Sequence, residues 1–307
     1  RFGGCKMVLY RDQFAPEEET QFAAMTFLLP DGTAFVAFRG TDRSLVGWKE
    51  DFNMAFQEAV PAQLLAQDYV REVAAEYVMP LRLGGHSKGG NLAVFAAARS
   101  TPDIQQRILE VYNNDGPGFT DYLMGDPGYL AMVPRIKTYV PQSSVIGMLL
   151  EHEERYEVVR STQIGLMQHD GFSWQVRGER FEHLPDRTEG GKLVDETLRA
   201  FIVSLSDEQR VAFIDALFDI LTCTDADTLT DLKEGGLRTA AAMVKKYRTL
   251  DKDTRQALGS TLRLFMKAGA KTAASELNPV QLLLRHLPLQ KLAEGLESQE
   301  PADAPAK

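Results

Sequence analysis

A serine lies between two glycines in the run Gly85-His86-Ser87-Lys88-Gly89. The apolar residues before it predict a short strand, and the alanine-rich residues after it predict a helix. A serine at such a junction must turn sharply, and Gly85 and Gly89 leave room because they carry no side chain. The turn would aim the free N–H groups of the helix start at the reacting oxygen. The pattern predicts a serine nucleophile; the alternative is a glycine turn whose serine only caps the helix.

A serine hydroxyl needs a base to become a nucleophile at neutral pH, and the chain has five histidines. His169 is the best candidate, because it lies in a turn-forming loop after the predicted strands and follows the order nucleophile, acid, base. The others are expected in supporting or surface roles: His86 beside the serine, His152 in a solvated charged stretch, His183, and His286.

A second donor for an oxyanion is predicted where the apolar strand Phe35 to Phe38 runs into Arg39-Gly40-Thr41. Gly40 would let the backbone approach a substrate, so that Thr41 offers its N–H and its hydroxyl. The Lys88 N–H would be the other donor. The alternative is an ordinary turn into the next helix, with Asp42 as its cap.

Alternating strand-like and helix-like segments must position these residues. Strands are predicted at Cys5 to Tyr10, Phe22 to Leu29, Thr33 to Phe38, Leu81 to Leu83, Ile108 to Asn114, Ile136 to Val140, Arg155 to Arg160 and Phe172 to Val176. Helices are predicted at Trp48 to Ala59, at Pro61 to Val78 and after the serine. Strands that alternate with crossover helices favour an α/β fold with a mostly parallel sheet, covered on both faces.

Helical apolar spacing dominates after about residue 190, with a capping-box pattern at Ser206 and Gln209. We therefore expect an α/β domain over residues 1–190 and a C-terminal helical region over residues 191–296. The helical region would pack on the first domain, or act as a lid or a module for a partner that the sequence does not identify. The polar, proline-containing tail over residues 297–307 is expected to be disordered.

The 307 residues carry a net charge of −9 and are 44% hydrophobic, which is typical of a soluble globular protein. The acidic balance argues against nucleic acid as a partner. No stretch approaches the roughly 18 apolar residues of a membrane-spanning helix, and the first residues do not resemble a signal peptide. Cys5 and Cys223 are too few for a disulfide framework, which favours the cytoplasm, and no cysteine cluster indicates a metal site.

Three segments together resemble the class 3 lipases: Phe38-Arg39-Gly40-Thr41, then Trp48 with Asp51, then Gly85 to Ala93. They are still more similar to a bacterial family of lipase-like α/β-hydrolases classed as a domain of unknown function. The likeness covers Cys5 to Val176. It implies an α/β-hydrolase fold, Ser87 as nucleophile, Thr41 and Lys88 as oxyanion donors and His169 as base, but it supplies no substrate.

The acid of the triad departs from the class 3 pattern, because Gln142, Ser143 and Ser144 stand where those lipases place an aspartate. Asp115, at the tip of the strand after the serine helix, is the first choice. It could equally begin a turn with Gly116. Ser144 hydrogen-bonded to His169 is the weaker alternative, and Asp170 is too close to the base in sequence to be well aimed.

These residues predict a serine hydrolase of the esterase or lipase-like type, which forms an acyl-enzyme on a small ester or lipid-like substrate. No metal or organic cofactor is required. Two alternatives remain open. The same site could transfer the acyl group to an acceptor other than water, or the fold could be a catalytically weak or inactive scaffold or binding protein.

Overall fold

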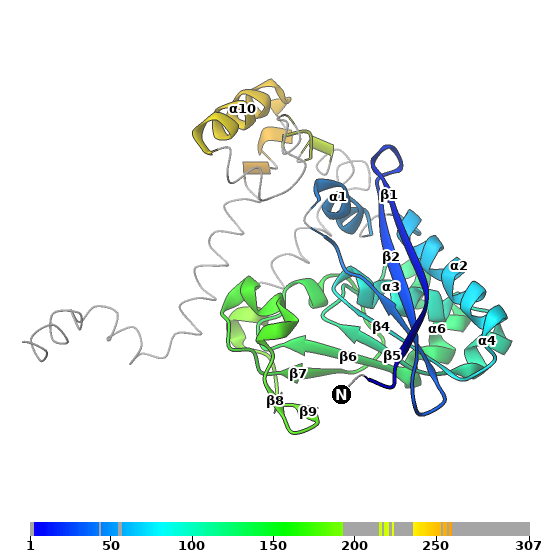
Figure 1. The fold of residues 1–307 in the computed structure, drawn as a ribbon. Helices are drawn as coiled ribbons and strands as arrows, with labels where there is room; N and C mark the ends of the chain where they lie inside the picture. Colours follow the sequence, from blue (N-terminus) through cyan, green and yellow to red (C-terminus); the bar gives the residue numbers. More distant parts are fainter. Residues whose placement is uncertain are drawn as a thin grey trace, which may run out of the picture.

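The computed structural model describes residues 3–42, 44–54, 57–192, 215–216, 218–220, 223, 236–252, 254–256 and 258–259. Its centre is an eight-stranded sheet in the order β1-β2-β3-β4-β5-β6-β7-β10 (Figure 1). The strands are β1 (Lys6–Ala15), β2 (Thr20–Leu28), β3 (Ala34–Phe38), β4 (Leu81–His86), β5 (Ile108–Asn114), β6 (Ile136–Pro141), β7 (Tyr156–Val159) and β10 (His183–Leu184). A separate hairpin pairs β8 (Val176–Arg177) with β9 (Arg180–Phe181).

Strands β3 to β7 run parallel, whereas β1, β2 and β10 join the edges antiparallel. The helices are α1 (Leu45–Asn53), α2 (Pro61–Glu76), α3 (Lys88–Ala98), α4 (Pro102–Arg107), α5 (Asp121–Met124), α6 (Pro127–Met132) and α10 (Gly236–Thr249). The prediction of an α/β-hydrolase fold with a mostly parallel sheet is confirmed. In the part of the chain that the structure describes, no helix combines the length and apolar character needed to cross a membrane.

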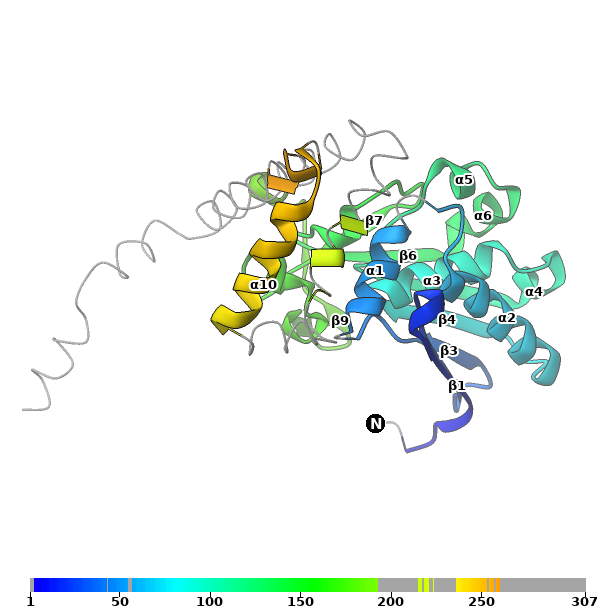
Figure 2. The same cartoon turned by 90° about the horizontal axis from the view of Figure 1, so that it is seen from above.

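Helices α2, α3 and α6 pack together on one face of the sheet (Figures 1 and 2). Side chains on that face, such as Val36, Leu83 and Val111, are fully buried. The opposite face carries partly exposed residues such as Arg82 and Tyr112. The sequence predicted helices on both faces of the sheet, and for the helices that the structure describes this prediction is wrong. Each strand from β3 to β6 is followed by its direct neighbour, so right-handed crossovers all fall on the same side.

The end of the sheet also differs from the prediction. Residues Gly171–Ser173 form a 3₁₀ turn, η5, rather than a strand, because the Asp170 carboxylate accepts the Phe172 N–H at 3.0 Å and closes the turn. The last strand of the sheet is β10. Helix α1 begins and ends earlier than predicted, and β1 continues five residues further.

Most of the predicted helical region lies outside the described residues, as does the tail over 297–307. The described part includes α10, which contributes Met243 and Tyr247 to a small apolar cluster, and Leu250, directly after the helix, joins them. Its buried members are Ala216, Ile220 and Leu258.

Candidate active site

Ser87 occupies the turn between β4 and α3 with φ 58° and ψ −131°. A positive φ is unfavourable for a residue with a side chain and costs about 1–3 kcal/mol, so the surrounding contacts must hold it. The Ser87 N–H donates to the carbonyl of Asn114 at 2.9 Å, and the Ser87 carbonyl accepts the N–H of Gly90 at 2.9 Å. The residue is partly exposed. The fold therefore presents a serine on a strained turn that solvent can reach.

Glycines surround this turn because backbone segments meet there. A Cβ atom on Gly85 would overlap the backbone of Gly89, and one on Gly89 would overlap the carbonyl of Phe38. A Cβ on Gly40 would lie 2.6 Å from the His86 carbonyl oxygen and 3.4 Å from the Ser87 Cβ. The segment that carries Thr41 is thus brought against the serine.

His169 and Asp115 are joined by a hydrogen bond of 2.7 Å between the imidazole Nδ1 and the Asp115 Oδ2. The Asp115 side chain is 1% exposed and that of His169 is 26% exposed. An ionised carboxylate only accepts hydrogen bonds, so Nδ1 carries a proton, and in the neutral ring the lone pair is then on Nε2. This is the tautomer that a general base needs. His169 lies at the end of η4 (Gly165–His169), one of the 3₁₀ turns after β7.

Asp115 follows β5 directly and has φ 55°, so it turns out of the strand in the left-handed region. Its N–H donates to the Tyr139 carbonyl at 2.8 Å. Asn91 of α3 holds the next residues, because its amide donates to the Pro117 and Gly118 carbonyls at 3.0 Å. Helix α3 therefore positions both the serine and the loop that bears the acid.

Ser144 donates its hydroxyl to the Asp115 Oδ1. The weaker alternative, a bond from Ser144 to His169, is therefore wrong. Both Asp115 oxygens thus accept hydrogen bonds, Oδ2 from the His169 imidazole and Oδ1 from the Ser144 hydroxyl. Gly147 of η3 (Ile146–Met148) closes against the same carboxylate, where a Cβ would overlap Oδ1.

His86 supports the base. Its Nε2 lies 2.6 Å from the His169 carbonyl oxygen and must donate, because a carbonyl only accepts. The two rings lie 4.6 Å apart between centroids. Burial and the neighbouring His169 lower the pKa of His86, which favours a neutral ring beside the base.

His152 was predicted to be solvated, which is wrong, because its side chain is 6% exposed. Its Nδ1 lies 3.0 Å from the Glu154 carboxylate and its Nε2 2.8 Å from the Gly147 carbonyl. Both partners can accept a hydrogen, so His152 links the Glu154 carboxylate to the Gly147 carbonyl. His183 is 40% exposed and pairs with Glu157, whereas His286 lies outside the described residues.

Thr41 and Lys88, the predicted oxyanion donors, flank the serine turn. As the first residue of α3, Lys88 has no carbonyl within the helix to receive its N–H. The Thr41 hydroxyl donates to the Asp51 carboxylate of α1. Asp42 accepts the Ser44 N–H at 2.8 Å, which gives it a role as a turn former before α1.

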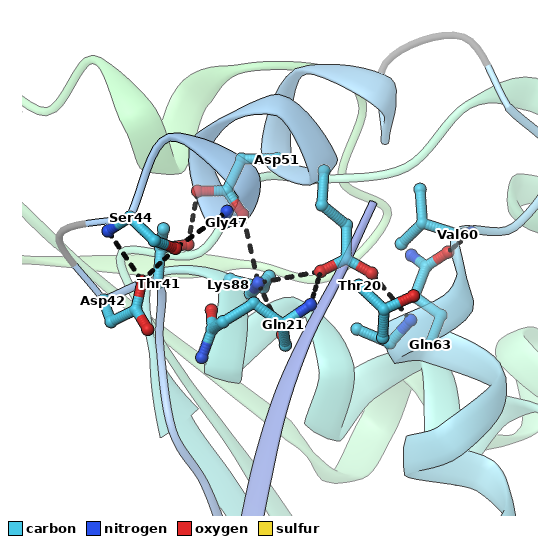
Figure 3. Close-up of polar contacts among 12 residues, drawn as sticks. Thr20, Gln21, Thr41, Asp42, Ser44, Gly47, Asp51, Val60, Gln63 and Lys88 are labelled. Atoms are coloured by element: carbon cyan, nitrogen blue, oxygen red, sulfur yellow. Dashed lines mark hydrogen bonds and ion pairs between the residues drawn. The ribbon is translucent and has the colours of Figure 1, made fainter. Parts of the chain in front are cut away.

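The side chain of Lys88 is the feature that the sequence did not reveal. It is 1% exposed and lies among Gln21, Glu50 and Asp51 (Figure 3). One signal could have indicated this burial: Lys88 begins a helix whose other residues are mostly small and apolar. A lysine buried there requires carboxylate partners for its ammonium. Among the described residues, no three His, Cys, Asp or Glu side chains are grouped so as to hold a metal ion.

The sequence and the structure were compared with those of known proteins. No curated protein matched the sequence. Among solved structures, the chain is similar to a triacylglycerol lipase from Penicillium expansum, with 14% identity over 52% of this chain and 71% of the lipase chain and a TM-score of 0.35. The profile of the Mbeg1-like family matches residues 1–219. The chain belongs to the lipase-like Mbeg1-like family, as the motifs around Thr41 and Ser87 predicted.

Proposed function

We propose that this protein is a serine hydrolase that cleaves carboxylic esters through an acyl-enzyme. The observation that carries the proposal is the Asp115–His169 hydrogen bond beside a serine held at positive φ. Strained backbone at a strand-to-helix turn is typical of catalytic serines. A buried acid that fixes the imidazole tautomer is the second part of the same machinery.

In this mechanism the His169 Nε2 removes the Ser87 proton as Ser87 Oγ attacks the ester carbonyl. Negative charge develops on the carbonyl oxygen, where the N–H groups of Lys88 and Thr41 stabilise it. The imidazolium, stabilised by Asp115, then protonates the leaving alcohol. Water attacks the acyl-enzyme in the same way and restores Ser87.

Exposed apolar side chains support a lipid-like acyl group as substrate. Met167, two residues before the base, is 65% exposed, and Phe172, three residues after it, is fully exposed. Ile164 in the same segment is 40% exposed. Apolar surface beside a reactive centre favours substrates with an apolar part.

The test is hydrolysis of 4-nitrophenyl esters with acyl chains from acetyl to decanoyl, followed by release of 4-nitrophenolate. The proposal expects turnover that Ser87→Ala and His169→Ala abolish while the far-UV circular dichroism stays unchanged. Turnover that survives in Ser87→Ala would contradict it. Adding an alcohol and measuring ester product against free acid distinguishes hydrolysis from acyl transfer by the same residues.

A further inference from the structure

The ammonium of Lys88 lies in a polar cluster (Figure 3), and the Lys88 side chain is buried. Its Nζ donates to the Gln21 carbonyl at 2.8 Å and to the Glu50 Oε2 at 3.0 Å, and it lies 3.8 Å from the Asp51 Oδ1. An ammonium withdrawn from water destabilises the fold unless anions surround it. The residue that follows Ser87 thus places its ammonium next to two carboxylates, Glu50 and Asp51.

The two carboxylates of the cluster differ in how they are held. Glu50 accepts backbone N–H groups from Gln21 at 3.0 Å and from Ala62 at 2.9 Å in addition to the ammonium. Asp51 accepts the Thr41 hydroxyl on Oδ2, and its Oδ1 is shielded from solvent without a hydrogen bond among the described residues. Asp51 therefore depends on the nearby charge of Lys88 for stabilisation of its ionised form.

Four groups act on the Asp51 carboxylate through their charge or through a hydrogen bond: Lys88 of α3, Glu50 of α1, His169 of η4 and the Thr41 hydroxyl. Burial raises the pKa of Asp51 to about 6, with Lys88, Thr41 and His169 opposing the rise and Glu50 adding to it. Two carboxylates thus share one ammonium. Removing Lys88 would leave the more weakly held carboxylate, Asp51, to take up a proton.

The ionisation of Asp51 decides what the Thr41 side chain can do. An ionised carboxylate only accepts, so it fixes the single hydroxyl hydrogen of Thr41 and with it the side-chain rotamer. A protonated carboxyl group can form only a neutral hydrogen bond with the hydroxyl, and such a bond is about half as strong as a charge-assisted one. Protonation of Asp51 would therefore weaken the anchor on Thr41, whose N–H is the second oxyanion donor in the proposed mechanism.

We propose that Lys88 is a positioning residue whose buried ammonium keeps Asp51 ionised, so that Asp51 anchors Thr41 beside the nucleophile. The residue next to Ser87 then serves one half of the oxyanion site through its N–H and the other half through its side chain. This inference rests on the proposed function for its kinetic consequence, whereas the ionisation of Asp51 can be measured without any activity.

The first experiment follows the Asp51 carboxyl carbon by NMR in protein labelled with ¹³C at the aspartate carboxyl groups, with Asp51→Asn to assign the signal. The chemical shift of this carbon is measured against pH, and the midpoint of the titration gives the pKa of Asp51. In Glu50→Gln, which keeps the ammonium and removes the competing carboxylate, this midpoint should fall. In Lys88→Met/Glu50→Gln, which removes one charge of each sign, it should rise by about 1 pH unit or more. Opposite shifts support the proposal, and an unmoved midpoint in either variant overturns it.

The second experiment measures the rate at which a fluorophosphonate modifies Ser87 at pH 7.5. Loss of an oxyanion donor costs about 10²–10³ in rate, and we expect its loosening in Lys88→Met/Glu50→Gln to cost about tenfold. Thr41→Val removes the hydroxyl and keeps the volume and the N–H. In the Thr41→Val background the same double substitution should change the rate little, since the anchor is already gone.

If Lys88→Met/Glu50→Gln slows the modification of Ser87 equally with and without the Thr41 hydroxyl, the positioning role of Lys88 is overturned. If the double variant does not fold, Glu50→Gln alone still decides, because a midpoint that does not fall shows that Lys88 does not control Asp51. If the wild-type protein folds and Ser87 is never modified, the proposed function fails, while the NMR titration still tests the link between Lys88 and Asp51.

Discussion

At the scale of single residues, the Asp115 carboxylate is the best-defined part of the site, with one oxygen on His169 and the other on Ser144. The sequence predicted Asp115 and His169 from chain order and from the position of Asp115 after a strand. It could not predict the partner of Ser144, because that depends on how a loop folds back over 29 residues. Local sequence places residues at strand ends, whereas contacts between loops depend on tertiary packing.

Asp115→Asn should lower kcat by about 10³–10⁴, because an amide no longer holds the imidazole in the required tautomer. The comparison is steady-state ester hydrolysis against Asp170→Asn. Asp170 is next to the base but accepts the Phe172 N–H, which an asparagine can also do, so its variant should keep activity. Equal effects of the two substitutions would show that Asp115 has no special role.

The backbone at Ser87 gives a prediction on stability. Glycine adopts φ 58° without strain, whereas alanine keeps the strain of the serine. Ser87→Gly should therefore unfold at higher urea concentration than Ser87→Ala, with a difference of about 1 kcal/mol in the free energy of unfolding. Two variants of equal stability would mean that the turn stores no strain.

At the scale of elements, the turn between β4 and α3 is held by close backbone contacts. Both its glycines were predicted from the need for space, and β4 was predicted from its short apolar run. The predicted strand at Phe172 to Val176 failed because apolar content alone does not reveal that Asp170 closes a turn there. The burial of His152 was missed because its acidic neighbours suggested solvent.

Gly89→Ala should destabilise the fold by about 1–3 kcal/mol or more, since its Cβ would overlap the Phe38 carbonyl, a backbone atom that cannot move aside cheaply. Gly125→Ala is the matched control. A Cβ there meets open space, and φ is −88°. Urea unfolding should separate the two variants, and a Gly89→Ala protein as stable as Gly125→Ala would refute the packing argument.

At the scale of the molecule, buried polar groups tie the sheet to the site. Glu154 accepts hydrogen bonds from Tyr129, Thr138 and His152, and His152 in turn holds the Gly147 carbonyl beside Asp115. Burial raises the pKa of Glu154, but these hydrogen bonds outweigh it and lower the pKa to about 2. The parallel sheet could be predicted from alternating elements, but this network, which joins α6, β6 and the loop before β7, could not.

The pKa of Glu154 is 4.5 in the unfolded chain and about 2 in the folded protein. Such a carboxylate stabilises the fold fully at pH values above 4.5, and this contribution is lost as the pH falls toward 2. Glu154→Gln should therefore destabilise the protein more at pH 6 than at pH 3. The difference between wild type and variant should shrink by roughly 2 kcal/mol across this range. Urea unfolding at both pH values measures it, and a difference independent of pH would contradict an ionised Glu154.

The described helices cover one face of the sheet, and this arrangement follows from the topology of the whole sheet. Alternation of strands and helices predicts a parallel sheet, but the side on which each helix falls depends on the order of strands. Here consecutive strands are neighbours, and sequence periodicity does not report that order.

Covalent modification of Ser87 tests the central claim most directly. Folded protein is treated with a fluorophosphonate, and the modified peptide is identified by mass spectrometry in the wild type, Ser87→Ala and His169→Ala. The account predicts one modified residue, Ser87, with modification abolished in the first variant and slowed at least a hundredfold in the second, in line with the ~10²–10⁴ contribution of general base catalysis. Folded wild-type protein that stays unmodified, or Ser87 that reacts equally fast without His169, would contradict it.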